Sequence, residues 1–156
     1  MTKKVVGLIP IKLNNERLPG KNTKLLGDKA LCQYLFDTVT KVGNLDEVYV
    51  YCSDDSICQY IPDGIRFLKR PAELNGSTIK SRQILECFVA QIDADVYALM
   101  HVTEPFIKPE TIRTSIAQVL SGEFDSAFVA HTIKEFAWYR DNPLNYALTD
   151  VVKTQE

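Results

Sequence analysis

The chain has 156 residues, a formal net charge of −2 and 46% hydrophobic residues. This length and composition predict one folded domain with a substantial core and exclude a disordered chain. Lys and Arg number 18 against 20 Asp and Glu, so the overall charge gives no reason to expect a nucleic-acid partner.

The apolar segments and the cysteines indicate the cellular setting. The run near the N-terminus is too short for a signal peptide, and no apolar stretch is long enough to cross a membrane. The four cysteines, Cys32, Cys52, Cys58 and Cys87, form no C-x-x-C pair and fit neither a zinc site nor a disulfide scaffold. We therefore expect a cytoplasmic protein with reduced, mostly buried thiols and no membrane partner.

Strand and helix patterns alternate along the chain. Apolar and β-branched runs predict strands at residues 5–9, 48–52, 65–68, 96–100 and 126–130. Helical spacing of apolar residues predicts three helices between these strands, and Pro109 can open the last of them. The predicted inward-facing residues are Leu31, Leu35, Phe36, Val39 and Val42 in the first helix, Ile84, Leu85, Phe88, Val89 and Ile92 in the second, and Ile112, Ile116, Val119 and Leu120 in the third. This alternation predicts an α/β layered fold with a largely parallel central sheet.

The most distinctive segment is the polar loop at residues 10–22, which follows the first strand. It is longer than most connections, and its two prolines restrict the backbone, which argues against disorder. Lys12, Arg17 and Lys21 bring positive charge together, and Gly20 permits a close backbone approach. The combination suits a polyphosphate, although a solvated basic loop is the simpler alternative. The loop is neither a Walker loop nor a G-x-G-x-x-G turn.

Polar segments follow the other strands as well, at residues 53–55, 69–81 and 101–105. In a parallel α/β sheet, ligands bind outside the carboxyl ends of the strands. All four polar segments are therefore predicted to meet at one edge of the sheet and to form a nucleotide site. The chain ends after an aromatic, polar stretch at 138–143 without a capping element, so we expect a domain spanning 1–156 that lacks its C-terminal portion.

Five segments carry a family resemblance, in order and with consistent spacing. Residues 9–22 resemble the pattern I-P-A-R-x-x-S-x-R-[IL]-P-G-K-N, and residues 50–55 resemble V-S-T-D. Residues 70–81 resemble R-P-x-x-L-[AS]-x-D-x-[AST], residues 99–106 resemble L-L-Q-P-T-S-P-L, and residues 153–156 resemble R-T-Q-D. These patterns are those of the acylneuraminate cytidylyltransferases, the CMP–sialic acid synthetases, which are related to the CMP–Kdo synthetases. The first and third motifs are specific in combination.

The resemblance implies a Rossmann-like nucleotidyltransferase three-layer fold and transfer of CMP from CTP to a 2-keto sugar acid, with Mg²⁺ as cofactor and pyrophosphate released. It also implies a homodimer if the full-length chain is present. Lys21 and Lys12 are the candidate catalytic residues. The candidate nucleotide-binding residues are Lys12, Asn15, Arg17, Gly20, Lys21, Asn22, Arg70 and Ser81. The sugar acid is expected at His101, Thr103, Arg140 and Lys153, and Asp54 and Glu104 are weak candidates for the metal.

Several positions depart from the family pattern. Lys12 stands where the family has Arg, Asn15 replaces a small Ser, Glu16 adds a carboxylate, Ser77 takes an acidic position and His101 replaces Gln. Each candidate also has a simpler interpretation. Arg70 could pair with Glu73 at the surface, His101 could satisfy a strand end, Asp54 could cap a helix, and Glu104 could be solvated.

Three functions remain open at this point. The first is a CTP-dependent cytidylyltransferase for a sialic acid-like sugar acid, and the second is a nucleotidyltransferase for another nucleotide or sugar. The third is a truncated, non-catalytic nucleotide-binding module, because family members carry a late acidic pair that has no counterpart before Glu156. On that ground we expect the chain to bind nucleotide better than it turns it over.

Overall fold

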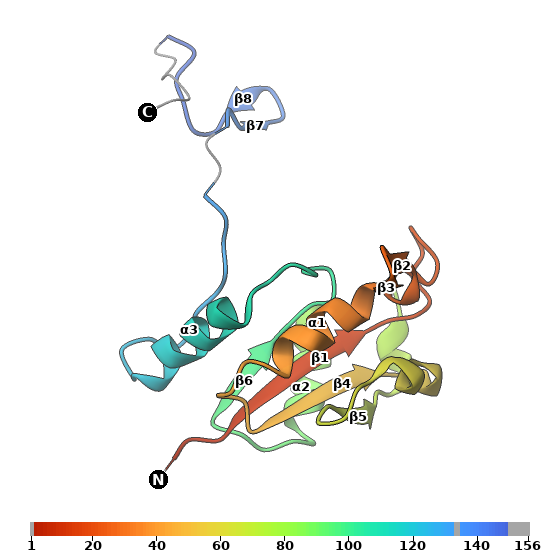
Figure 1. Ribbon diagram of the computed structural model, residues 1–156. Coiled ribbons are helices and arrows are strands. Elements are labelled where there is room, and N and C mark those ends of the chain that lie inside the picture. The colour runs from red at the N-terminus through yellow and green to blue at the C-terminus, as the bar shows by residue number, and fades with distance from the viewer. Residues whose placement is uncertain (1, 133–134, 150–156) are drawn as a thin grey trace.

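The computed structural model describes residues 2–132 and 135–149. A sheet of four strands forms the centre, in the order β5-β4-β1-β6. These strands are β1 (Val5–Ile11), β4 (Glu47–Cys52), β5 (Arg66–Lys69) and β6 (Val96–Leu99), and every neighbouring pair is parallel. The predicted α/β fold with a largely parallel sheet is confirmed (Figure 1).

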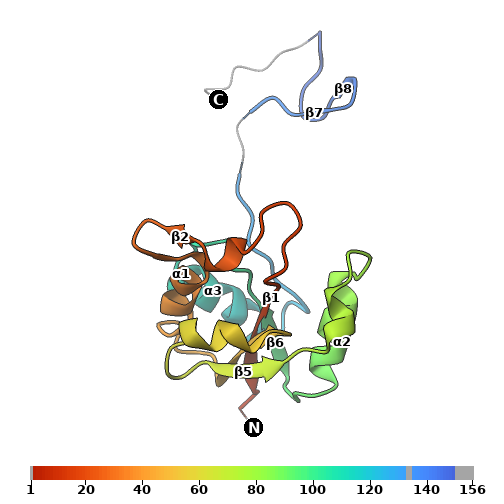
Figure 2. The same cartoon turned by 90° about the vertical axis from the view of Figure 1, so that its right-hand side faces the viewer.

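Helices cover both faces of this sheet and complete three layers. Helices α1 (Leu31–Val39) and α3 (Pro109–Leu120) lie on one face, and α2 (Ser81–Val89) lies on the other, as Figure 2 shows with the sheet between them. Pro109 stands in the first turn of α3, where its missing N–H costs no hydrogen bond.

The two faces of the sheet bury unequal cores. The face under α1 and α3 contains the larger cluster, to which β1, β4 and both helices contribute aliphatic side chains. The face under α2 is smaller and aromatic, because the Phe88 ring makes edge contacts with Tyr49, Tyr51 and Tyr97 at centroid distances of 5.8, 5.4 and 6.3 Å. The fully buried members of the larger cluster are Ile9, Ile11, Cys32, Leu35, Phe36, Val42, Val50, Cys52 and Ile57.

The central strand β1 owes its position to an apolar sequence and to one glycine. A Cβ on Gly7 would lie 2.9 Å from Met100 Cε and 3.2 Å from a Val48 methyl, so a larger residue there would force these side chains, above all the flexible end of Met100, to shift. The strand also runs further than the sequence predicted, through Pro10 to Ile11. Proline is tolerated because pairing with β6 ends at Leu8, so at Pro10 only β4 is a neighbour and one side of the strand needs no N–H.

Shorter elements connect these layers. A small antiparallel hairpin, β2 (Leu25–Leu26) with β3 (Lys29–Ala30), precedes α1. Three 3-10 helices follow β1, β4 and β5: η1 (Lys21–Thr23), η2 (Asp55–Tyr60) and η3 (Ala72–Asn75). Each of these short helices therefore lies at the carboxyl edge of the sheet.

Two predictions about buried elements are wrong. Residues 126–130 form no strand; they are exposed, and Phe128 is 89% exposed. Their β-branched and aromatic composition favours a strand, but a strand also needs a hydrogen-bonding neighbour, and none of the described strands pairs with them. Val89 is 43% exposed rather than buried, because Phe88 points at the sheet and the next residue lies about 100° further around the helix.

The described C-terminal part forms a small antiparallel hairpin of β7 (Trp138–Tyr139) and β8 (Asn142–Pro143). Its aromatic rings contact one another, since Tyr146 lies 4.6 Å from Phe136 and 6.2 Å from Trp138 between ring centroids. Figure 1 shows this hairpin apart from the sheet, so it takes no part in positioning the carboxyl edge.

Two general predictions can be compared with the structure. None of the helices in the described ranges is long and apolar enough to cross a membrane. All four cysteines are free; Cys32 and Cys52 are buried, Cys87 is partly buried and Cys58 is exposed, so burial holds for fewer thiols than expected.

Candidate functional site

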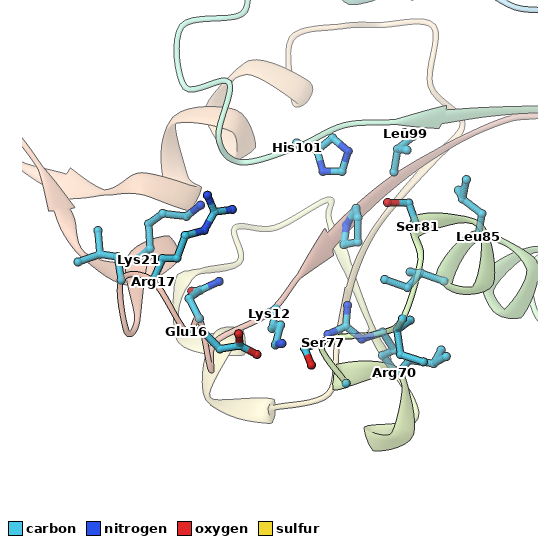
Figure 3. A pocket seen from close by; sticks show the side chains of 17 residues that line it. Lys12, Glu16, Arg17, Lys21, Arg70, Ser77, Ser81, Leu85, Leu99 and His101 are labelled. Atoms are coloured by element: carbon cyan, nitrogen blue, oxygen red, sulfur yellow. The ribbon is translucent and has the colours of Figure 1, made fainter. Parts of the chain in front are cut away.

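A cavity of about 640 Å³ opens at the carboxyl edge of the sheet. Its size lies in the usual range for small-molecule sites. The loop after β1, the segment from the end of β5 to the start of α2, and the end of β6 all line it, so segments far apart in the sequence meet here (Figure 3). The predicted meeting of the segments that follow β1, β5 and β6 is therefore found, whereas residues 53–55 after β4 do not line the cavity.

The loop after β1 is held in shape by local hydrogen bonds. Gly20 adopts a left-handed backbone conformation with φ 65°, which favours glycine, and this turn starts the 3-10 helix η1. The Lys21 N–H donates to the Leu18 carbonyl at 3.1 Å. Asn22 is buried, and its Nδ2 donates to the Lys12 carbonyl at 2.8 Å across the loop. The backbone positions of Lys12 and Lys21 are thereby fixed relative to each other.

Three cations from this loop line the cavity: Lys12, Arg17 and Lys21. Arg17 is exposed, and the two lysines are half-buried. Asn15 also lines the cavity, and its Oδ1 is buried without a hydrogen-bond partner. Glu16 is the single acidic residue among the described lining residues. The loop therefore presents a net positive wall to whatever enters.

The fourth cation, Arg70, comes from the end of β5 and differs from the other three. It is 2% exposed, and its Nη2 donates to Asn75 Oδ1 at 2.7 Å, whereas its Nε is buried without a partner. No carboxylate of the described residues forms an ion pair with it, and Glu73 is exposed instead. Burial lowers the pKa of the Arg70 guanidinium, because removal from water disfavours the charged form.

The opposite side of the cavity is mostly apolar. In Figure 3, Leu85 and Leu99 lie on the right, opposite Arg17 and Lys21 on the left, and Ser81 lies beside the two leucines. Leu74, Ile79 and Ile84 add further apolar surface, and Ser77 and His101 add polar groups that are exposed to solvent. The cavity thus combines a cationic side with an apolar side that carries hydroxyl groups.

This arrangement suits an elongated ligand with several negative charges at one end. Cations that converge from two loops can bind several anionic oxygens at once, and the planar Arg70 fork can contact two of them. The apolar side can bury a flat, uncharged part of the same ligand, while the serine hydroxyls orient it.

The predicted site residues divide into two groups. The cavity brings together Lys12, Asn15, Arg17, Lys21, Arg70, Ser81 and His101. Gly20 and Asn22 do not line it but shape the loop that does.

Thr103 and Glu104 are exposed in the turn after β6, outside the lining. Arg140 lies in the turn between β7 and β8, where its guanidinium carbon is 5.2 Å from the Tyr139 ring centroid. Lys153 lies outside the described residues.

The metal candidates find little support in the geometry. Asp54 caps η2, since its Oδ1 accepts a hydrogen bond from the Ser56 N–H at 2.9 Å. In the described ranges, no group of three or more His, Cys, Asp or Glu side chains is placed to hold a metal ion. Of the acidic residues that the structure describes, only Glu16 lines the cavity, where it could meet a cation that arrives with an anionic ligand.

Sequence reasoning missed Asn75 and Ser53. Asn75 Nδ2 donates to Ser53 Oγ at 2.7 Å, and its Oδ1 accepts from Arg70, so the amide links the ends of β4 and β5. No sequence signal marks this pair, because an Asn before a Gly is read as a turn and a Ser after a strand is read as a helix cap.

Comparisons with known proteins agree with this geometry. The family model described as cytidylyltransferase matches residues 6–154. A 3-deoxy-manno-octulosonate cytidylyltransferase of Hydrogenovibrio crunogenus is 26% identical over 126 residues, which are 80% of this chain and 50% of that protein. A CMP-N,N'-diacetyllegionaminic acid synthase of Legionella pneumophila is 24% identical over 120 residues, 72% of this chain and 52% of that protein.

The fold is shared with solved structures. A CMP:2-keto-3-deoxy-manno-octonic acid synthetase, solved in complex with CTP, superposes with a TM-score of 0.64 at 23% identity. The superposition covers 76% of this chain and 48% of that one. The chain thus spans about half the length of the relatives that it matches, and the predicted nucleotidyltransferase fold is confirmed.

Proposed function

Because the chain belongs to the cytidylyltransferase family, we propose that its cavity binds CTP and that the protein transfers CMP to a 2-keto sugar acid. One observation carries this proposal. Arg70 is a buried guanidinium with no carboxylate partner among the described residues, and it lines the cavity with three further cations. A buried charge without a counter-charge is costly, and an anionic ligand such as a triphosphate would remove that cost.

In this proposal the triphosphate occupies the cationic side and the nucleoside occupies the apolar side. Lys21 and Lys12 contact phosphate oxygens as point charges, and Arg17 and Arg70 add planar contacts. Asn15, with its unpartnered Oδ1, and Ser81 are available to hydroxyl or amino groups of the nucleotide. Gly20 and Asn22 keep the loop in the conformation that brings these groups together.

The chemical step requires charge stabilisation more than covalent participation. A hydroxyl of the sugar acid attacks the α-phosphorus and loses its proton to water, the bond to the bridging oxygen breaks, and pyrophosphate leaves with the electron pair. Negative charge grows on the leaving oxygens, and the cations of the loop after β1 stand where they can stabilise it. Of the residues predicted to contact the sugar acid, His101, which follows β6, is the one that lines the cavity in the described part of the chain.

Mg²⁺ enters this proposal as the companion of CTP. Among the described lining residues, Glu16 supplies a carboxylate to the cavity, and Mg²⁺ is usually held by one or two carboxylates together with phosphates and water. Bound there, the ion would neutralise phosphate charge. Glu16 would orient it, whereas Asp54 is engaged in helix capping.

The identity of the sugar acid is the finer part of the proposal. The named substrates of the relatives are 3-deoxy-manno-octulosonate and N,N'-diacetyllegionaminic acid, and we propose an acceptor of this carboxylated type, sialic acid included. A homodimer of the full-length protein remains a proposal as well.

Calorimetry with CTP and with ATP, at equal Mg²⁺, tests the nucleotide. We expect CTP to bind more tightly; equal affinities would favour a different nucleotide, and no binding of either would exclude the proposal. Pyrophosphate release from CTP with a panel of Kdo, sialic acid and legionaminic acid then tests the acceptor. We expect release with at least one of the three.

A second candidate is nucleotide binding without turnover. It is favoured by one observation, namely that Glu16 alone supplies a carboxylate to the described lining. A poorly positioned metal would slow the transfer, because positioning supplies much of the rate. Tight CTP binding with no pyrophosphate release for any acceptor would select this candidate.

A further inference from the structure

A short network of neutral side chains holds the Arg70 guanidinium at the wall of the cavity. Its Nη2 donates to Asn75 Oδ1 at 2.7 Å, and Asn75 Nδ2 donates to Ser53 Oγ at 2.7 Å. The Arg70 N–H also donates to the Cys52 carbonyl at 2.9 Å, which fixes the backbone at the end of β5 against β4. Asn75 thus holds the guanidinium, while the bond to Cys52 holds the backbone of the same residue.

The orientation of the Asn75 amide follows from these contacts. Asn75 closes the short helix η3, so its backbone is set by the turn that begins after Pro71. The Arg70 guanidinium carries donors only, so it meets the oxygen end of the Asn75 amide. The Ser53 hydroxyl holds the same amide in place, because it accepts from Asn75 Nδ2 at 2.7 Å and its Oγ lies 3.1 Å from Asn75 Oδ1, to which it can donate.

The partner of Arg70 is an amide and not a carboxylate, and this difference is electrostatic. An Asn oxygen accepts a hydrogen bond but carries no net charge, whereas an Asp of the same shape would neutralise the guanidinium in a buried ion pair. With Asn75 in place, the positive charge of Arg70 stays uncompensated beside a cavity that three other cations line.

We propose that Asn75 is a positioning residue: it holds the Arg70 guanidinium in place for an incoming anion without neutralising the positive charge. We propose further that Ser53 holds the Asn75 amide in place. This inference rests on the proposed nucleotide site and adds to it a specific reason for the neutral partner. The anion is the phosphate portion of the nucleotide, and free pyrophosphate shares its chemistry.

Asn75→Asp tests the inference because it keeps the shape and adds the missing charge. Without ligand, the new buried pair should raise Tm by about 2–4 °C. The affinities for CTP and for pyrophosphate, measured by calorimetry, should fall about tenfold or more, because Arg70 would already be neutralised. Stability and binding should thus change in opposite directions. A merely structural role of Asn75 would move both in the same direction or leave binding unchanged, and either result would overturn the inference.

Gln118→Glu is the matched control for the added charge. It makes the same change from amide to carboxylate on an exposed position of α3, outside the cavity lining. The affinity of this variant for CTP should lie within about twofold of that of the unsubstituted chain, because exposed charges at a distance are screened. A loss equal to that of Asn75→Asp would show an effect of overall charge and would overturn the inference.

Ser53→Ala provides a second variant in case Asn75→Asp does not fold. Removal of the hydroxyl frees the amide, and the affinity for CTP should fall about threefold to tenfold, the range for loss of one net hydrogen bond. In an Arg70→Met background the same change should have no effect on affinity. An equal loss in both backgrounds would show that Ser53 does not act through Arg70 and would overturn the inference.

These experiments separate the two proposals. If the unchanged chain binds neither CTP nor pyrophosphate, the nucleotide site is wrong and the inference fails with it. If CTP binds and Arg70→Met weakens binding, but Asn75→Asp does not, the nucleotide site stands and only the role of Asn75 is overturned.

Discussion

The two polar segments that line the cavity place positive charge in different ways. The loop after β1 carries Lys12, Arg17 and Lys21 on an exposed or half-exposed surface, where water and salt solvate them. The segment after β5 carries Arg70, which is buried beside a neutral amide. Both segments face one cavity. Of the two, only the segment after β5 carries a charge that is buried from water and has no counter-charge when no ligand is bound.

This difference assigns separate tasks to the two segments. Exposed cations attract an anion over several ångströms and lose influence as salt is added. A buried cation acts at contact, is screened less, and makes the empty protein less stable than it would be with an apolar residue. The loop after β1 should therefore supply most of the attraction, and Arg70 should supply the largest single contact.

Replacement of Arg70 should have the largest effect. Arg70→Met removes the buried charge and should weaken CTP binding by about 2–5 kcal/mol, the scale for losing one partner of a desolvated pair. The free energy of unfolding without ligand should stay within about 1 kcal/mol or rise, because the charge and the Asn75 contact are lost together. Calorimetry and thermal melts measure the two quantities.

Arg66→Met is the control for this prediction. Arg66 begins β5, the strand that Arg70 follows, but it is exposed and pairs with Glu47 at 2.5 Å, outside the cavity lining. Its replacement should leave CTP binding unchanged. If Arg70→Met lost stability while binding CTP normally, Arg70 would be a structural residue and the contrast between the segments would disappear.

Lys21 should give the next largest effect. Lys21→Ala removes one charge-assisted contact to the triphosphate and should weaken CTP binding by about 1.5–3 kcal/mol. The loss should shrink between 50 and 500 mM NaCl, whereas that of Arg70→Met should change little, because screening acts on the exposed charge. Lys24→Ala, on an exposed residue two positions beyond this loop and outside the lining, is the matched control. Equal salt dependence of both losses would contradict the division of tasks.

Glu16 should give a small effect of opposite sign. Glu16→Gln removes the one carboxylate among the described lining residues and should strengthen binding of CTP without Mg²⁺ by about 0.2–1 kcal/mol. With Mg²⁺ present the gain should vanish or reverse if Glu16 orients the ion. Glu73→Gln, exposed and outside the lining, serves as the control in the same calorimetric titrations.

Lys12 should give the smallest effect. Lys12→Arg keeps the charge and offers a planar fork to phosphate oxygens, so CTP affinity should hold or improve slightly. The backbone of Lys12 is already fixed by Asn22, so the substitution changes only the side chain. A large loss, with Lys24→Arg unchanged, would mean that Lys12 does not face the triphosphate.

The sequence predicted the layered fold because its apolar periodicities are strong. The runs of β1 and β4 alternate with helices whose apolar faces are clear, and this pattern leaves few alternatives to a parallel sheet. The predictions failed where burial depends on neighbours. Val89 follows the helical pattern but points to solvent, and residues 126–130 have strand composition without a strand beside them.

The sequence likewise predicted some residues of the candidate site and missed others. The charged loop was visible because three cations, two prolines and a glycine stand within one segment. Arg70 was visible only through its motif, and the sequence left open whether it pairs with Glu73 or lies in the site. Asn75 and Ser53 could not be found, because their contact joins two loops 22 residues apart.

The sequence by itself determined the alternation of the four sheet strands with the three α-helices, the parallel sheet and the edge at which polar segments gather, because each follows from local periodicity and from the rule that parallel strands share one carboxyl edge. Only the tertiary structure decided that Arg70 is buried, that its partner is the neutral Asn75, and that the loop cations face the same cavity. The physical reason is that solvation and charge compensation depend on which segments meet in space, and neither is encoded in the spacing of residues along one segment.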